Sequence, residues 1–206
     1  YGDRLKRVAS FDKEDPTLHE SDVPPMTRFL VDQYTDSDES STGHRVMFFD
    51  IEVEVTEGFP DVQKAYNPIT SIALYDCITE KYFTYCFDPH KRIESYEKDN
   101  EVVEFYETEY EMLNQFFQKY LEIRPTIISG WNSEFFDIPY LYNRAVRILG
   151  PELANLLSPI SQVIYSEYKK KHTIAGVSSL DYLQLYRQFT FTMQSSYRLD
   201  YIGEVE

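Results

Sequence analysis

The stretch that decides the fold is Val46-Met47-Phe48-Phe49-Asp50-Ile51-Glu52-Val53, an apolar run that ends in two acids. Its β-branched and aromatic residues predict a strand that continues to Val55. Asp50 and Glu52 project from one face of such a strand, because side chains alternate with a period of two. Neighbouring carboxylates suit hard divalent cations such as Mg²⁺, which prefer oxygen ligands. Metal-dependent cleavage of a phosphodiester is therefore the leading hypothesis.

Two interpretations of this strand are open. In the first, Asp50, Glu52 and Glu54 face water while the residues between them face a core. In the second, the four apolar residues before Asp50 indicate a strand covered on both faces. The acids then stand at its carboxyl end, where open α/β sheets place their sites. The apolar run favours the second interpretation.

From residue 44 onward the chain alternates regularly between strand and helix patterns. The predicted strands lie at 46–55, 69–77, 81–87, 102–106, 126–129, 163–168 and 172–177, the last two as a hairpin. The predicted helices lie at 109–121, 138–149, 180–189 and 196–205. Three antiparallel strands followed by alternating helix and strand indicate an α/β fold, a ribonuclease-H-like mixed sheet flanked by helices.

Residues 1–43 differ from the rest. They mix charge with proline, carry one apolar island from Met26 to Tyr34, and end in a polar run from Thr35 to Gly43. We interpret them as a short N-terminal extension, the remnant of a preceding domain and a linker, before a domain that spans residues 44–206.

The formal net charge of −15 argues against a protein that coats nucleic acid, since such proteins are normally basic. This charge is still compatible with an enzyme that binds nucleic acid locally, through metal ions and a few basic residues. The triplet Lys169 to Lys171 is typical of a solvated turn. Beside a phosphodiester site, Lys170 and Lys171 would instead grip a backbone phosphate.

Cys77 and Cys86 lie in the two arms of a predicted hairpin. In the expected register Cys77 faces Tyr82 and Cys86 faces Ala73, so a reduced pair is expected. No apolar run approaches the roughly 20 residues of a membrane span, and the N-terminus lacks the pattern of a secretion signal. These features predict a cytoplasmic protein with no membrane partner.

Two further candidates each have two interpretations. Asp137 precedes a predicted helix with Pro139 near its start, so it is either a helix cap or a functional acid. Phe59, in the loop after the acidic pair, is either a core residue or a ring that stacks on a base. Such stacking is worth roughly 1–3 kcal/mol.

Six segments together resemble a known family: 49–52, 57–60, 130–132, 136–140, 180–182 and 196–202. In this order they resemble the 3′–5′ exonuclease domain of family B DNA polymerases, above all those of T-even-type bacteriophages and their marine relatives. The resemblance implies a proofreading enzyme that trims the 3′ end of single-stranded DNA in the cytoplasm of a phage-infected bacterial cell. It also implies a monomer whose partners are the polymerase domains of the intact chain, and residues 1–43 resemble the end of that family's N-terminal domain.

By the same resemblance, Asp50 bridges two divalent ions (Mg²⁺ or Mn²⁺), Glu52 helps to hold the ion with the attacking water, and Asp137 supports the second ion. Two ions about 4 Å apart would activate water and stabilise the leaving 3′ oxygen. Segment 163–177 resembles the hairpin that helps to separate primer from template. The residues implied to contact the strand are Phe59 and Asn132.

One departure from the family pattern affects the expected activity. The family's third motif, a Tyr followed four residues later by Asp, lies downstream of the matched region, and the sequence stops at Glu206 before it. The pair Tyr34 and Asp38 has this spacing but lies in the predicted linker. We therefore expect the chain to hydrolyse DNA weakly or not at all. Two alternatives stay open, a non-catalytic acidic module that binds a basic partner and an RNA-trimming exonuclease of the same superfamily.

Overall fold

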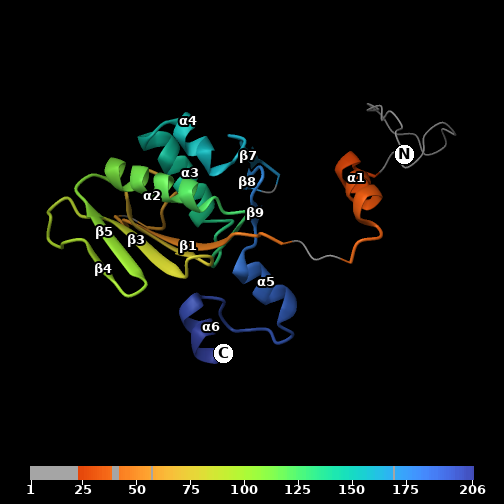
Figure 1. Cartoon of the computed structure of the whole chain (residues 1–206). Coiled ribbons are helices and arrows are strands. Elements are labelled where there is room, and N and C mark those ends of the chain that lie inside the picture. The colour runs from red at the N-terminus through yellow and green to blue at the C-terminus, as the bar shows by residue number, and fades with distance from the viewer. Residues whose placement is uncertain (1–22, 39–41, 57, 169) are drawn as a thin grey trace. The chain divides into compact units, whose positions relative to one another are not determined.

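Figure 1 shows a computed structural model, which describes residues 23–38, 42–56, 58–168 and 170–206. The chain divides into two compact units, Tyr1–Thr42 and Gly43–Glu206. In the first unit the described residues form helix α1 (Pro25–Tyr34), so the apolar island of the sequence is helical. Much of the predicted N-terminal extension, residues 1–22 and 39–41, lies outside the described residues.

The second unit is built on a seven-stranded mixed sheet, which confirms the predicted fold class. Its strands are β1 (Val46–Val53), β2 (Ile69–Asp76), β3 (Lys81–Phe87), β4 (Tyr96–Lys98), β5 (Glu101–Tyr106), β6 (Ile127–Ser129) and β9 (Ser178–Ser179). They lie in the order β4-β5-β3-β2-β1-β6-β9. The pairs β1–β2, β2–β3 and β4–β5 are antiparallel, and β3–β5, β1–β6 and β6–β9 are parallel.

Helices and a small hairpin complete this unit. The helices are α2 (Glu109–Ile123), α3 (Asp137–Ile148), α4 (Pro151–Ala154), α5 (Tyr182–Phe189) and α6 (Leu199–Val205), with a 3-10 turn at Asn155–Leu157. The hairpin consists of β7 (Val163–Ser166) and β8 (Lys171–Ile174). Figure 1 shows α2, α3 and α4 together on one side of the sheet. Among the described residues, no helix has the length and apolar character to cross a membrane.

Strand β1 is buried on one face only. Its buried residues are Met47, Phe49 and Ile51, and its exposed residues are Phe48, Asp50 and Glu52. Met47 and Phe49 line the same core space as Phe116 of α2 and Leu141 of α3. The prediction of a strand covered on both faces is therefore wrong, because helices of the core pack on one side of β1 and the acids project from the other.

The predicted register of the hairpin between β2 and β3 is wrong by two residues. Cys77 lies in the turn and not opposite Tyr82, and Cys86 lies opposite Ser71 and not Ala73. The Asp76 carboxylate explains the shift, because it accepts hydrogen bonds from the Ile78 amide and the Thr79 hydroxyl. Such a side-chain bond starts a turn without glycine or proline. Both cysteines are free thiols.

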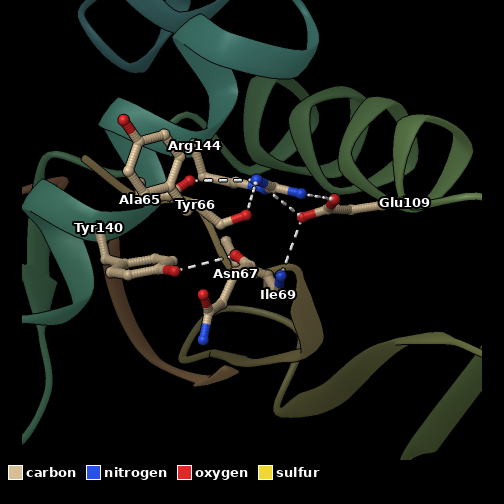
Figure 2. A network of polar contacts seen from close by, with 7 residues as sticks. All are labelled: Ala65, Tyr66, Asn67, Ile69, Glu109, Tyr140 and Arg144. Atoms are coloured by element: carbon tan, nitrogen blue, oxygen red, sulfur yellow. Dashed lines mark hydrogen bonds and ion pairs between the residues drawn. The ribbon is translucent and has the colours of Figure 1, made fainter. Parts of the chain in front are cut away.

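A buried ion pair fastens the loop between β1 and β2 to helices α2 and α3 (Figure 2). Arg144 Nε and Nη2 donate to the two carboxylate oxygens of Glu109 at 2.8 and 2.6 Å. Both side chains also bind the loop backbone. Arg144 Nη1 donates to the carbonyls of Ala65 and Tyr66, and Glu109 accepts a hydrogen bond from the Ile69 amide. The pair thus sets where the chain returns to the sheet after the acidic end of β1.

We expect Arg144→Met to lower the free energy of unfolding by about 3–5 kcal/mol, because it leaves the Glu109 carboxylate buried without its charge partner. Lys81→Met is the matched control, since it removes a cation from the exposed pair with Glu97, whose N–O distance is 3.0 Å. That change should cost less than about 1 kcal/mol. Chemical denaturation measures both, and equal losses would contradict the structural role of Arg144.

Candidate active site

The site lies where β1 loses its parallel neighbour. Strand β6 pairs with only the first part of β1, Val46 to Phe48, and the chain then leaves the sheet. Past this point the Ile51 amide bonds to a side chain, and Asp137 Oδ1 accepts its hydrogen at 3.0 Å. Asp50 and Glu52 flank Ile51 in the sequence. The bond therefore brings the buried Asp137 to the end of β1 that carries both acids, close enough to Asp50 for its charge to act on Asp137.

Asp137 does not cap helix α3. The N-cap residue is Phe136, and no side chain makes a capping hydrogen bond there. The first turn is instead joined to the preceding loop through the backbone, where the Ile138 amide donates to the Ser133 carbonyl at 2.9 Å. The helix-cap interpretation of Asp137 is therefore wrong, because its carboxylate is turned toward β1.

Gly130 allows the loop after β6 to pass close to β1. A Cβ atom on this residue would lie 2.6 Å from the Phe49 carbonyl oxygen and 2.9 Å from Ser133 Cβ. Real Cβ atoms essentially never come this close to a backbone oxygen, because the two atoms would overlap. Only glycine fits here, and its absent side chain lets the loop lead directly to Asp137.

The surroundings of Asp137 favour its protonated form. The pKa of Asp137 is raised to about 7, chiefly by burial and also by the charge of Asp50, and the hydrogen bond from the Ile51 amide opposes both effects. The side chain is only 3% exposed. Desolvation of a carboxylate beside a like charge is costly, so the site holds more negative charge than its own groups offset.

Asp50 and Glu52 reinforce this excess of charge. The Asp50 side chain is exposed, but the protein around it removes part of its hydration and so raises its pKa, and the neighbouring Glu52 carboxylate adds to the effect. Within the described residues, neither side chain has a hydrogen-bond or ion-pair partner. The pair is therefore able to accept a ligand that offers positive charge.

Asp181 holds the loop that leads from β6 to α3. As the N-cap of α5 it accepts from the Leu183 amide at 3.0 Å, as a structural acid would. It also accepts from the Asn132 amide at 3.0 Å and the Glu134 amide at 3.1 Å. One buried carboxylate thus joins the start of α5 to the loop before Asp137.

Trp131 joins the same loop to the C-terminal helices. Its indole Nε1 donates to the Tyr197 carbonyl at 3.0 Å. Its ring packs near Tyr182 and Tyr186 of α5, with centroid distances of 6.1 and 5.9 Å. Trp131 is therefore attached to α5 by aromatic contacts and to the segment between α5 and α6 by a hydrogen bond.

Phe59 and Asn132, which the family resemblance implies contact the DNA strand, lie beside and within the loop that leads to Asp137. Phe59 is 81% exposed, so its core interpretation is wrong, and its ring centroid lies 5.2 Å from that of Phe136, just before Asp137. Asn132 has a positive φ of 62°, and its carbonyl accepts hydrogen bonds from the amides of Phe135 and Phe136. Phe59 is thus available to a ligand, while the Asn132 backbone shapes the loop.

The two lysines predicted to grip a phosphate, Lys170 and Lys171, have different surroundings. Lys170 is exposed in the turn of the hairpin, with a φ of 49°. Lys171 begins β8, and its Nζ lies 2.8 Å from Glu134 Oε2. Lys169, the third residue of the triplet, lies outside the described residues.

Asp50, Glu52 and Asp137 do not form a complete metal site in this structure. Over the described part of the chain, no three His, Cys, Asp or Glu side chains are arranged to hold a metal ion. The donor chemistry nevertheless suits Mg²⁺ or Mn²⁺, because Asp50, Glu52 and Asp137 present only oxygen ligands. Their unbalanced charge is a further point in favour of a bound cation.

Comparison with known proteins assigns this chain to a family. The model for the DNA polymerase family B exonuclease domain matches residues 30–202. This chain belongs to that family. The match spans every strand of the mixed sheet and all three acids of the site, so the resemblance found in the motifs is confirmed.

Relatives of this exonuclease domain are DNA polymerases. The DNA-directed DNA polymerase of Escherichia phage RB69 is 37% identical over 191 residues, covering 79% of this chain and 21% of that protein. The DNA-directed DNA polymerase of Enterobacteria phage T4 is 32% identical over 185 residues, covering 75% and 20%. DNA polymerase 1 of Saccharolobus solfataricus is 39% identical over 131 residues, covering 64% and 13%. The chain thus spans about a fifth of the length of the two phage relatives.

Two roles at the site were not predicted from the sequence: Asp181 holds the loop before Asp137, and Glu134 pairs with Lys171. Asp181 lies in a segment that contributed to the family resemblance, and this was the available signal for its importance. Glu134 carried no signal, because its partners Lys171 and Asp181 are distant in the sequence and belong to other elements.

We expect Gly130→Ala to destabilise the protein by about 1–3 kcal/mol, as overpacking does. The new methyl group would have to push the loop away from Phe49. Gly203→Ala is the control, since no atom lies within 4 Å of the Cβ position in helix α6. Thermal unfolding measures both, and a harmless Gly130→Ala would contradict the close approach.

We expect Asp137→Asn to stabilise the metal-free protein at high pH. An acid whose folded pKa is raised to about 7 supports the fold while protonated and loses that contribution as the pH rises through 7. Asparagine stays neutral and still accepts from Ile51, so the gain at high pH should reach roughly 2–4 kcal/mol, at about 1.4 kcal/mol per pKa unit.

Unfolding by urea in the presence of EDTA, between about pH 4 and 8, measures this gain. The control is Asp99→Asn, an exposed acid with a φ of 55° that asparagine tolerates. A difference between Asp137→Asn and the parent that does not change with pH would contradict the raised pKa.

Proposed function

We propose that this exonuclease domain releases the 3′-terminal nucleotide of single-stranded DNA, with Asp50, Glu52 and Asp137 as its catalytic acids. The observation that carries the proposal is the hydrogen bond between Asp137 and the Ile51 amide. It joins the first and second acidic motifs at one place in the fold. Because the chain belongs to the exonuclease family, we interpret these acids as the groups that act on a phosphodiester.

The acids would hold divalent cations, Mg²⁺ or Mn²⁺. Three facts support this role: an all-oxygen donor set, the raised pKa values of Asp50 and Asp137, and the lack of a partner for Asp50 and Glu52 among the described residues. When bound, such ions make water a stronger nucleophile and stabilise the leaving oxygen. The protein itself would hold the Asp137 carboxylate in place through the Ile51 amide, and it leaves the side chains of Asp50 and Glu52 available to the ions.

The DNA end would be oriented by aromatic and polar groups near the acids. Phe59 presents an exposed ring for stacking on a base, and it rests on Phe136 of the loop that leads to Asp137. Asn132 lies in that same loop. At the tip of the hairpin, Lys170 offers an exposed charge for a backbone phosphate.

Fluorescence anisotropy with a short single-stranded DNA, with and without Mg²⁺ or Mn²⁺, tests the proposal. We expect binding that depends on the metal and that weakens about tenfold or more in Asp50→Asn, because a shared ligand is lost. Asp99→Asn removes an equal charge from an exposed turn and should leave binding unchanged.

Other outcomes would favour the alternatives. Absence of DNA binding with either metal would overturn the exonuclease proposal and leave an acidic interaction module. Tighter binding to a strand with a ribose 3′ terminus than to its deoxyribose counterpart would favour an RNA-trimming enzyme. Stepwise release of terminal nucleotides, abolished by Asp50→Ala, would establish the full activity directly and would contradict the expectation that this chain hydrolyses DNA weakly or not at all.

A further inference from the structure

The hairpin of β7 and β8 is anchored along one side. In β8, His172 and Ile174 are buried, 7% and 5% exposed. The His172 ring lies between Tyr142 of α3 and Tyr165 of β7, at centroid distances of 4.9 and 5.0 Å. The contact of His172 with Tyr142 holds strand β8 against α3, whereas Tyr168 near the tip is 95% exposed.

Lys171 makes a separate contact between the hairpin and the site loop. Its Nζ pairs with Glu134 Oε2 at 2.8 Å, and the two side chains are 27% and 15% exposed. The Glu134 backbone is itself fixed, because its amide donates to Asp181. The ion pair therefore ends on a rigid loop, three residues before Asp137.

The pair is suited to exchange rather than to permanent attachment. A partly exposed ion pair shifts an equilibrium by a factor of about two to five, so a competing anion can replace one partner. His172 and Ile174 keep β8 in place without it. A nucleic-acid phosphate matches Glu134 in charge and in hydrogen-bonding capacity, and lysine binds both.

We propose that Glu134 holds Lys171 at the site loop in the free protein, and that a phosphate of single-stranded DNA takes its place on binding. This inference rests on the proposed function. Lys171 is then a strand-binding residue, already held at the loop before Asp137 when DNA arrives. Glu134 limits affinity, since its charge must be displaced before Lys171 can grip the strand.

The opposite effects of two substitutions test this. The probe is a fluorescein-labelled oligodeoxythymidylate with phosphorothioate linkages at its 3′ end, measured by anisotropy with Mg²⁺. Glu134→Gln should tighten binding about threefold, because Lys171 is released from a competing partner. Lys171→Gln should weaken binding by a similar factor and lower the salt dependence by about one phosphate contact. In the double variant, Glu134→Gln should give no such gain.

Glu167→Gln is the matched control, because it removes the same charge from an exposed position in the hairpin turn. It should have a small effect that is equal with and without Lys171. Lys171→Arg should retain the affinity of the parent, which separates lost charge from a disturbed hairpin. Thermal unfolding shows that each variant is folded.

Different results would overturn the exchange at Lys171 and the proposed function. If the parent binds DNA but Glu134→Gln and Glu167→Gln act alike in both backgrounds, the exchange is overturned and the proposed function stands. If neither the parent nor Glu134→Gln binds DNA with either metal, both are overturned.

Discussion

One hydrogen bond, from the Ile51 amide to the Asp137 carboxylate, organises the functional end of this protein. It exists because β6 is short, so that part of β1 is left without a strand on that side. A side chain from α3 fills the position that a neighbouring strand would occupy. The result places a buried acid at the end of the strand that carries two others, in a chain with a net charge of −15, an arrangement that favours a cation as the missing partner.

Charged residues far from solvent support this arrangement from both sides. The Arg144–Glu109 pair fixes the loop that follows the acidic end of β1, and the Tyr140 hydroxyl adds a bond to the Asn67 carbonyl (Figure 2). Asp181 fixes the loop that precedes α3. Buried charges of this kind are weak sources of stability, yet they define a single position for the backbone they bind.

The sequence predicted the mixed sheet because its strands follow local patterns, and the family resemblance singled out the acids as candidates. Alternation and β-branched residues marked β1, and two acidic motifs in order marked Asp50 and Asp137. The sequence did not predict the partners of Glu109, Arg144 or Lys171, since each pair joins distant segments and looks like solvated charge in the chain. The turn at Asp76 was misplaced because a carboxylate, and not glycine or proline, starts it.

Trp131 has a consequence for how the protein can be observed. It is the single tryptophan of the chain, and it stands between Gly130 and the loop that carries Glu134. Because its indole bonds to Tyr197 and packs against two tyrosines of α5, its emission depends on whether the C-terminal helices are seated. The protein thus contains one intrinsic optical reporter at the junction between its site and its last two helices, so excitation of tryptophan alone can follow the docking of those helices without any added label.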